Sequence, residues 1–470
     1  MRRNLLAKLR RNETIFPGII GFDHTVIPQV QNAILGRHDI ILLGLRGQAK
    51  SRLTRMLPDL LDEYLPIIAS SEVNDDPLAP ISKYGRERIA THGDGTPIAW
   101  IHRSERYGEK LATPDTSIAD LVGDIDPIKA AHRRLTYADE EVIHFGIIPR
   151  TNRGIFAINE LPDLQARIQV GLLNIMEEQD IQIRGFNIRF PLDVMMVFTA
   201  NPEDYTNRGN IITPLKDRID SQIITHYPKT IETGMAITRQ EAWQARGDDA
   251  PKVIVPGFMY EAIEQIAFEA RKSEFVDQRS GVSVRMTRSV LEEVISVAER
   301  RSLIAGEGTT VARISDLECI EPAITGKIEL VYEGEQEGAG NVAQVLIGRA
   351  VRTIFARHFP DPSEKQGGRK AYGRILQWFV SGNSVSLLPH TSAGSYGKAL
   401  ARVDGLREVV ATHAPPKRRA GYAPLMGFVL EALHQHSLLG KERGSGTDAT
   451  YTDLMGSVLS SIGPPDDEED

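Results

Sequence analysis

The stretch from Ile40 to Ser51, which reads IILLGLRGQAKS, constrains the fold more than any other part of the chain. An apolar run ends at Gly44, and a short loop then leads into a segment with helical spacing. A glycine-rich turn between a strand and a helix presents backbone N–H groups and a helix N-terminus to phosphate oxygens. The usual phosphate-loop pattern has a second glycine where this chain has Ala49. The stretch therefore predicts a phosphate-binding loop with one substitution.

Ala49 is compatible with such a loop if its backbone stays in the right-handed region, because a methyl group is the smallest possible intrusion. Lys50 would then reach the β- and γ-phosphates of a nucleotide, and Ser51 would bind Mg²⁺. The alternative is an ordinary turn between a strand and a helix, with an exposed lysine.

Apolar strands alternate with helical segments from about residue 16 to residue 229, which predicts an α/β domain with a parallel sheet covered on both faces. Strands are expected at 39–43, 154–158 and 194–200, and helices at 26–35 and 51–64, the second one broken at Pro58.

Two further segments of this domain predict insertions. Residues 66–121 are rich in turn formers and too long for a plain loop, so they predict an insertion with some β-structure. Residues 181–190 alternate apolar side chains around Arg184–Gly185 and predict a β-hairpin. Glu72, Asp75, Asp76, His92 and His102 of the longer insertion could hold a metal ion, although scattered loop residues are more often simply solvated.

The rest of the chain reads as helical. Residues 230–332 predict an all-α domain, and residues 335–470 predict a mostly helical region that ends in a disordered acidic tail. Residues 1–15 are basic and predict a solvated surface helix.

Composition excludes several classes of protein. The net charge of −8 argues against a surface built as a whole for nucleic acid. A single cysteine, Cys319, allows no intramolecular disulfide and no cysteine-based zinc site, which fits a cytoplasmic protein. No run approaches the roughly 18 apolar residues of a membrane span.

Polar residues follow the two later strands of the predicted sheet. Asn159 and Glu160 come after one strand, and Asn201 follows the next. Since the carboxyl ends of parallel strands meet at one edge, these residues should lie beside the phosphate loop. Glu160 could polarise an attacking water, Asn201 could orient it, and Asn159 could accept a hydrogen bond from a metal-bound water. Asn159 brings no charge, which predicts weaker Mg²⁺ binding than aspartate would give.

Each of these residues also has a purely structural interpretation. Glu160 could be a helix N-terminal acid favoured by the helix dipole. Asn201 could belong to a simple Asn-Pro turn.

In this order, the motifs resemble those of the AAA+ ATPases, and within them the branch of the magnesium-chelatase I subunit and the MoxR proteins. The resemblance covers roughly residues 15–330 and implies a P-loop α/β core with β-hairpin insertions followed by an all-α lid. It is carried by FPGIIG (16–21), GLRGQAKS (44–51), TSIADLVGDID (116–126), PRTNRGIFAINE (149–160), IQIRGFNIRF (181–190), VFTANPE (197–203), PLKDRID (214–220) and GVSVRMTR (281–288).

The resemblance implies where ATP and Mg²⁺ bind. Ile20 would lie beside the adenine, Arg285 of the lid would reach the phosphates, and Ser51 and Asn159 would hold Mg²⁺ through the nucleotide. The loop residues that would cradle the phosphates are Gly44, Leu45, Arg46, Gly47, Gln48, Ala49, Lys50 and Ser51.

The resemblance also implies a ring, typically a hexamer, in which Arg218 reaches the γ-phosphate of a neighbouring subunit. Arg208 is the alternative finger. Either arginine could instead be a surface residue paired with Asp217 or Asp220.

The implied function is an ATPase that couples hydrolysis to remodelling or metal-cofactor maturation of a partner, often one with a von Willebrand A domain. Ala49 and Asn159 make nucleotide binding a safer prediction than fast hydrolysis. The alternatives are an ATP-binding scaffold or switch, and a nucleic-acid or transcriptional motor. The acidic composition and the lack of a recognisable DNA-binding module disfavour the motor.

Overall fold

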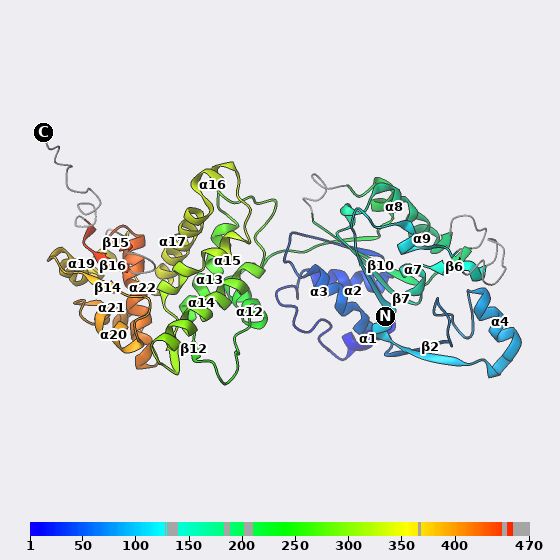
Figure 1. Cartoon of the computed structure of the whole chain (residues 1–470), viewed down its shortest axis with the longest axis horizontal. Coiled ribbons are helices and arrows are strands. Elements are labelled where there is room, and N and C mark those ends of the chain that lie inside the picture. The colour runs from blue at the N-terminus through cyan, green and yellow to red at the C-terminus, as the bar shows by residue number, and fades with distance from the viewer. Residues whose placement is uncertain are drawn as a thin grey trace. The chain divides into compact units, whose positions relative to one another are not determined.

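The computed structural model describes residues 1–126, 128, 140–182, 189–201, 210–364, 368–443 and 449–454. The chain divides into two compact units, Met1–Tyr227 and Pro228–Asp470 (Figure 1). In the described residues, no helix is both long and apolar enough to cross a membrane.

The first unit is built on a five-stranded parallel sheet with the strand order β11-β1-β10-β7-β4. Every residue of β1 and β7 is buried, because helices cover both faces of the sheet. The three strands predicted from the sequence are confirmed as β1, β7 and β10. The five strands are β1 (Ile40–Leu43), β4 (Tyr107–Leu111), β7 (Gly154–Asn159), β10 (Val194–Ala200) and β11 (Ser221–Ile224).

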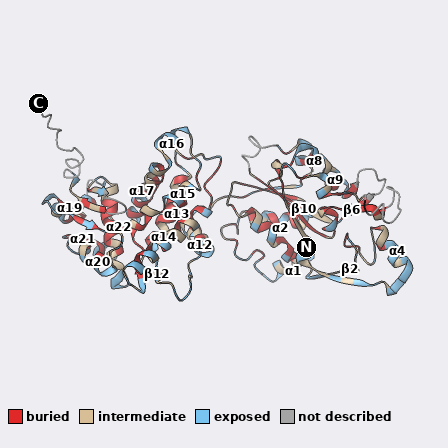
Figure 2. Ribbon diagram, viewed as in Figure 1, coloured by how far each residue is buried: buried red, intermediate tan, exposed pale blue. Residues whose placement is uncertain are grey.

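Successive residues of each strand enter different cores. Ile155 and Ala157 of β7 pack into a core with α1 (Arg2–Arg10) and α2 (Val26–Gly36), whereas Phe156 and Ile158 pack into the core on the other face. Figure 2 shows buried residues concentrated on these central strands. The N-terminal helix, expected to be solvated, fully buries Leu5 in the first core.

The helix after the phosphate loop is shorter than predicted. It forms α3 (Lys50–Met56) and continues as the 3₁₀ helix η1 (Leu57–Leu60), because Pro58 cannot donate a helical hydrogen bond. The predicted break at Pro58 is thus confirmed.

The single insertion predicted over 66–121 is wrong at its C-terminal end. β2 (Tyr64–Ile68) pairs antiparallel with β3 (Ile98–His102), and α4 (Lys83–His92) lies between them in the sequence. The chain then returns to the main sheet as its edge strand β4. The sequence of β4, YGEKL, has no apolar run, so hydrophobic periodicity could not reveal it.

Small elements complete the first unit around the sheet. The two strands of the predicted hairpin are present, since β8 (Asp180–Gln182) pairs antiparallel with β9 (Arg189–Pro191). The predicted turn at Arg184–Gly185 lies outside the described residues. The elements are α5 (Ile118–Leu121), β5 (Gly123–Ile125), β6 (Ile143–Phe145), α7 (Ile147–Arg150), α8 (Ala166–Gly171), α9 (Leu173–Glu178), β8 (Asp180–Gln182), β9 (Arg189–Pro191) and α11 (Thr213–Arg218).

The second unit is mainly helical, and one hydrophobic core runs through it from Phe258 to Tyr451. The boundary expected near residues 332–335 therefore does not separate two cores: α17 packs against both α13 and α22. Its helices are α12 (Ile231–Glu241), α13 (Gly257–Ala270), α14 (Arg285–Ile304), α15 (Glu321–Thr325), α16 (Tyr332–Glu337), α17 (Ala339–His358), α18 (Gly368–Ala371), α19 (Gly373–Val380), α20 (Ala393–Leu400), α21 (Leu406–His413) and α22 (Tyr422–Gln435).

The prediction that residues 230–332 are all helical is wrong in one detail. β12 (Lys252–Ile254) and β13 (Thr309–Val311) form a short parallel pair there. A three-stranded antiparallel sheet, β14-β16-β15, follows in the C-terminal part, with β14 at Val385–Leu387, β15 at Gly440–Arg443 and β16 at Ala449–Thr452. The acidic tail lies outside the described residues.

Candidate functional site

The phosphate-type loop follows β1 and is closely packed at its first residue. A Cβ atom at Gly44 would lie 1.9 Å from Oγ1 of Thr225 and 2.2 Å from Oε1 of Gln48. Those two side chains are themselves joined, because Thr225 Oγ1 donates to Gln48 Oε1 at 2.7 Å. Only glycine fits this position, because the side chains of Thr225 and Gln48 occupy the space that a Cβ atom would need.

Ala49 adopts the left-handed conformation, with φ 57° and ψ 17°, and directly precedes α3. The condition stated for this position, a right-handed backbone, is therefore not met. The left-handed region brings the alanine Cβ close to the following carbonyl oxygen, which costs roughly 1–2 kcal/mol. The loop thus keeps the backbone turn that the consensus glycine serves, with strain stored at Ala49.

Lys50 is buried at the centre of the site, with 7% of its surface exposed. Its Nζ donates to the carbonyl oxygen of Leu45 at 3.2 Å and to Oδ1 of Asn201 at 2.8 Å, and it also bonds the carbonyl of Gly44. The structure therefore brings the loop lysine to the tip of β10. It contradicts the alternative of an ordinary turn with an exposed lysine.

Thr199 ties the tips of β7 and β10 together. Its hydroxyl donates to Oδ1 of Asn159 at 3.1 Å and accepts from the backbone N–H of Glu160 at 3.2 Å. Glu160 also has a left-handed backbone, with φ 54°. Asn159, Glu160 and Asn201 thus stand at adjacent strand ends on one edge of the sheet, and Lys50 of α3 reaches Asn201 there.

Glu109 of β4 is a neighbour of this site that the sequence did not reveal. Nδ2 of Asn159 donates to Glu109 Oε1 at 2.5 Å. Arg55 of α3 grips the same carboxylate through Nε at 2.8 Å and through a second nitrogen at 2.9 Å. The hydrogen bond from Arg55 lowers the pKa of Glu109 below its usual value, so the carboxylate is ionised at neutral pH. The sequence carries no signal for it, because β4 has no apolar periodicity that would predict a strand.

Arg218, the predicted finger, ends α11 and forms an ion pair with Glu177 of α9. Its Nε donates to Glu177 Oε2 at 2.9 Å. The partner is therefore neither Asp217 nor Asp220, the two acids considered from the sequence. Arg208, the alternative finger, lies outside the described residues.

The other predicted ligand contacts lie on separate elements. Ile20 is half-buried in the segment before α2, next to Phe16 and Ile19 of the core. Arg285 opens α14 and belongs to the second unit. Ser51 lies in the first turn of α3, beside Lys50.

The acidic and histidine residues of the insertion do not form a metal site. In the parts of the chain that the structure describes, no group of three or more His, Cys, Asp or Glu side chains could hold a metal ion. Asp75, expected to be solvated, is buried and accepts backbone hydrogen bonds from Ile81 at 2.7 Å and Ser82 at 2.9 Å. It therefore organises its own loop.

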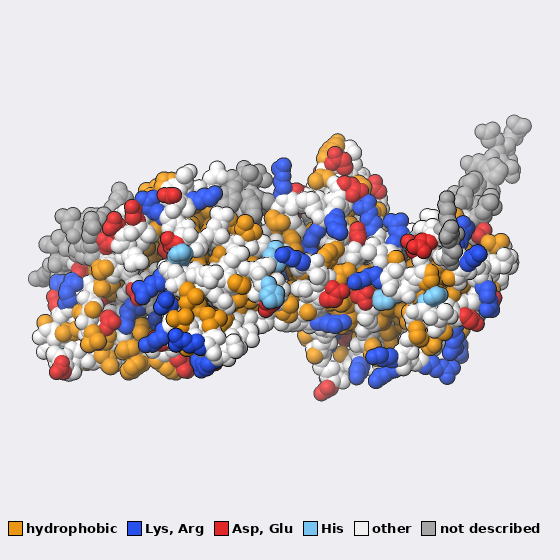
Figure 3. Space-filling model, turned by 180° about the vertical axis from the view of Figure 1, so that it is seen from behind, with side chains coloured by type: hydrophobic (Ala, Val, Ile, Leu, Met, Phe, Trp, Pro, Cys, Tyr) orange, Lys and Arg blue, Asp and Glu red, His pale blue; other side chains and the backbone are white. Residues whose placement is uncertain are grey.

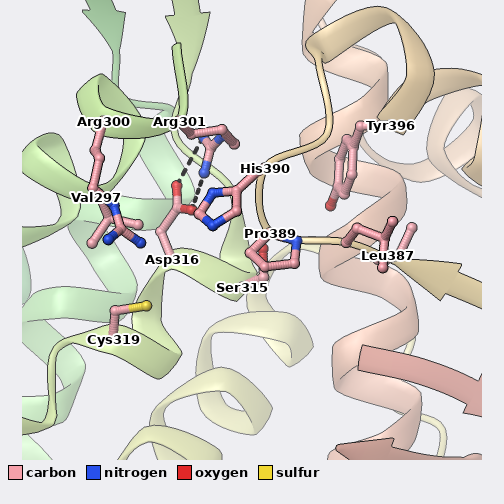
Figure 4. A pocket seen from close by; sticks show the side chains of 11 residues that line it. Val297, Arg300, Arg301, Ser315, Asp316, Cys319, Leu387, Pro389, His390 and Tyr396 are labelled. Atoms are coloured by element: carbon pink, nitrogen blue, oxygen red, sulfur yellow. Dashed lines mark hydrogen bonds and ion pairs between the residues drawn. The ribbon is translucent and has the colours of Figure 1, made fainter. Parts of the chain in front are cut away.

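A small pocket in the second unit is structural (Figure 4). Its volume is about 20 Å³, room for about one water molecule. Arg301 and Asp316 form a buried ion pair on its wall, and Asp316 also accepts from the backbone N–H of Arg313 at 2.7 Å.

On the face shown in Figure 3, basic and acidic side chains are interspersed over the surface.

Comparison with known proteins shows that the chain is similar to subunits of magnesium chelatase. No family model matches it. It is 25% identical over 328 residues to the magnesium-chelatase subunit ChlI of a Nostoc species, covering 66% of this chain and 83% of the relative. It is 27% identical over 243 residues to the magnesium-chelatase 38 kDa subunit of Cereibacter sphaeroides, covering 50% and 65%. It is 25% identical over 294 residues to ChlI of Anabaena variabilis, covering 59% and 81%.

Two solved structures match the chain at lower identity and with low TM-scores. A chain of the complex between the BchI and BchD subunits of magnesium chelatase is 17% identical, with a TM-score of 0.36, over 68% of this chain and 98% of that one. NtrX from Brucella abortus in complex with ATP is 13% identical, also with a TM-score of 0.36, over 63% and 53%.

Proposed function

We propose, on the premise that this chain is a relative of the AAA+ magnesium-chelatase I subunits, that its first unit binds and hydrolyses ATP. The observation that carries the proposal is the contact between Lys50 and Asn201 at 2.8 Å. It joins the phosphate-type loop after β1 to the tip of β10, beside Asn159 and Glu160. These residue types stand at the carboxyl edge of a parallel sheet, where such folds bind their ligands.

The residues fit a nucleotide with its Mg²⁺ ion. Gly47, with φ 76°, gives the loop a turn that glycine adopts without strain, and Gly44 lets the loop pack against Thr225 and Gln48. The hydroxyl of Ser51 and the amide oxygen of Asn159 are hard oxygen donors of the kind that Mg²⁺ and its waters prefer. When bound, Mg²⁺ neutralises charge on the β- and γ-phosphate oxygens.

Three side chains of the loop and the strand tips would then have different roles in hydrolysis. Lys50 would exchange the carbonyls of Gly44 and Leu45 for phosphate oxygens. Glu160 and Asn201 would hold the attacking water, whose oxygen bonds to the γ-phosphorus as the bond to the bridging oxygen breaks. The products are ADP and phosphate, and the water's proton leaves toward Glu160.

The finer part of the proposal concerns assembly. Arg218 would act in a ring, typically a hexamer, by reaching the γ-phosphate held by a neighbouring copy. For this Arg218 must leave Glu177, which costs little free energy because the ion pair is partly exposed. Hydrolysis would drive remodelling or cofactor maturation of a partner protein, of the kind that carries a von Willebrand A domain.

Nucleotide binding is tested most directly by calorimetric titration of ATP into the full chain. Lys50→Ala should abolish binding, because it removes the buried cation. Lys252→Ala is a matched control, because Lys252 is exposed and lies in the second unit. This variant should bind ATP as tightly as the parent chain. Equal affinity of the two variants would overturn the assignment of the loop.

A second candidate function, a nucleotide-dependent switch, is favoured by Ala49 and Asn159. The first carries backbone strain, and the second brings no charge to the metal side of the site. A switch would bind ATP with the same residues but turn it over negligibly. Steady-state hydrolysis separates the two functions, and a bound but unhydrolysed nucleotide would establish the switch.

A further inference from the structure

The amide of Asn159 stands between the side chains of Glu109 and Thr199. Its Nδ2 donates to Glu109 Oε1 at 2.5 Å, and its Oδ1 accepts from Thr199 Oγ1 at 3.1 Å. Asn159 is buried, with 8% of its surface exposed. Each end of the amide is therefore fixed by a partner, and the side chain has one orientation.

Glu109 and Asn159 meet because their strands are neighbours. β4 pairs in parallel with β7, with Leu111 opposite Asn159 and Glu109 opposite Ala157. Glu109 thus begins two residues further back along the sheet and extends its longer side chain to the strand tip. Its carboxylate thus lies beside Asn159 at the strand tip.

We propose that Glu109 supplies, from the neighbouring strand, the negative charge that Asn159 lacks. It does so by polarising the Asn159 amide toward the Mg²⁺ shell. This inference rests on the proposed ATP site. It makes Glu109 a positioning residue, since it acts through Asn159 and not on the nucleotide.

The chemistry of the Asn159 amide explains how the charge of Glu109 can affect the amide oxygen. A hydrogen bond to an ionised acceptor is roughly twice as strong as a neutral one. The amide oxygen has two lone pairs, of which Thr199 uses one, so the other can accept from a metal-bound water. A carboxylate on the N–H side makes that oxygen more negative, because hydrogen bonds in series polarise one another.

Arg55 does not cancel this effect. Its side chain is 64% exposed and that of Glu109 is 21% exposed, so solvent screens the guanidinium more than the carboxylate. The two hydrogen bonds from Arg55 instead hold the carboxylate toward Asn159. An ordinary surface ion pair would lack the third, inward-facing contact to a buried amide.

The test measures ATP affinity of the full chain with Mg²⁺ and with EDTA, in the parent, Glu109→Gln, Asn159→Asp and the double variant. Glu109→Gln keeps the size of the side chain and removes its charge. We expect it to reduce the gain in affinity that Mg²⁺ gives by about tenfold, while affinity in EDTA stays within about twofold of the parent.

The double variant moves the charge back to the strand tip. Glu109→Gln with Asn159→Asp should recover the Mg²⁺ effect, because it restores one carboxylate and one amide with their places exchanged. Asn159→Asp alone sets two carboxylates against each other and should lower the melting temperature of the nucleotide-free protein. The double variant should restore that temperature, which is a readout independent of ATP.

The outcomes separate the two proposals. If the parent chain binds no ATP under either condition, the proposed function fails and this inference fails with it. If the parent binds but Glu109→Gln shows the same Mg²⁺ effect, the inference alone is overturned. A double variant no better than Glu109→Gln would also overturn it.

Discussion

At the scale of single residues, the candidate site holds two strained backbones, Ala49 with φ 57° and Glu160 with φ 54°. Each conformation costs a non-glycine residue free energy that the surrounding contacts must offset. Ala49 directly precedes α3 and Glu160 directly follows β7, so both belong to the proposed ATP site. The strain fixes the backbone of the loop and of Glu160 before a ligand arrives.

The strain at Ala49 predicts that Ala49→Gly stabilises the protein. Relief of roughly 1–2 kcal/mol in the folded state exceeds the roughly 0.5–1 kcal/mol by which glycine favours the unfolded chain. We expect a net gain of up to about 1 kcal/mol in the free energy of unfolding, measured by urea denaturation.

The matched control for this substitution is Ala7→Gly in α1. Ala7 lies within a helix, so the same change should cost about 1 kcal/mol there. Losses of equal size at both positions would contradict the account of Ala49.

At the scale of elements, Asp39 joins three strands at the amino end of the sheet. Its Oδ1 accepts from the backbone N–H of Met196 at 2.7 Å, and its own N–H donates to Asp220 at 2.8 Å. Burial, together with the charge of Asp220, raises the pKa of Asp39 to about 7. A raised pKa means that the folded state favours the proton, so this group's stabilisation is lost as the pH rises from about 4 to 7.

Asp39→Asn should therefore stabilise the protein at high pH. An asparagine can still accept from Met196 but carries no charge to desolvate. We expect a gain of about 1–3 kcal/mol at pH 8 that shrinks toward pH 5, measured by urea unfolding at both values. A difference that does not change with pH would refute the assignment.

The ion pair between α9 and α11 allows a structural role of Arg218 to be distinguished from a catalytic one. Glu177→Gln and Arg218→Ala break the same ion pair, which is partly exposed and worth less than about 1 kcal/mol. If Arg218 is the finger, its removal should lower ATP turnover by a factor of about 10³ or more, whereas Glu177→Gln should leave turnover intact or raise it. Equal losses in both variants would show that the pair is only structural.

Elements also show how far the sequence could predict this fold. β1, β7 and β10 followed from apolar runs and lie within one residue of their expected ends. β4 escaped because its residues, YGEKL, carry no periodic signal and join the sheet only through pairing with β7. Glu109 was missed for the same reason, since its contact with Asn159 joins strands 50 residues apart. The left-handed turn at Ala49 was missed because alanine favours right-handed backbone.

At the scale of the whole molecule, the proposed ATP site lies in the first unit, and the proposed finger, Arg218, would act on another copy of the chain. The core of the second unit is continuous from α13 to β16, so the segment after residue 335 contributes to the stability of the helices before it. A chain cut at residue 335 loses α17, so it should expose the apolar surface of α13 and α15 that α17 covers, and lose solubility. A truncated chain that stayed soluble, and that kept the helix content of residues 1–335 by circular dichroism, would contradict this.

The most direct test of the central claim is steady-state ATP hydrolysis with Mg²⁺ over a range of protein concentrations. Glu160→Gln and Lys50→Ala are measured alongside the parent chain. The account predicts a rate that rises more steeply than linearly with concentration, because the finger comes from a neighbouring copy, and that is lost in both variants. A rate strictly proportional to concentration, or one that survives in Glu160→Gln, would contradict it.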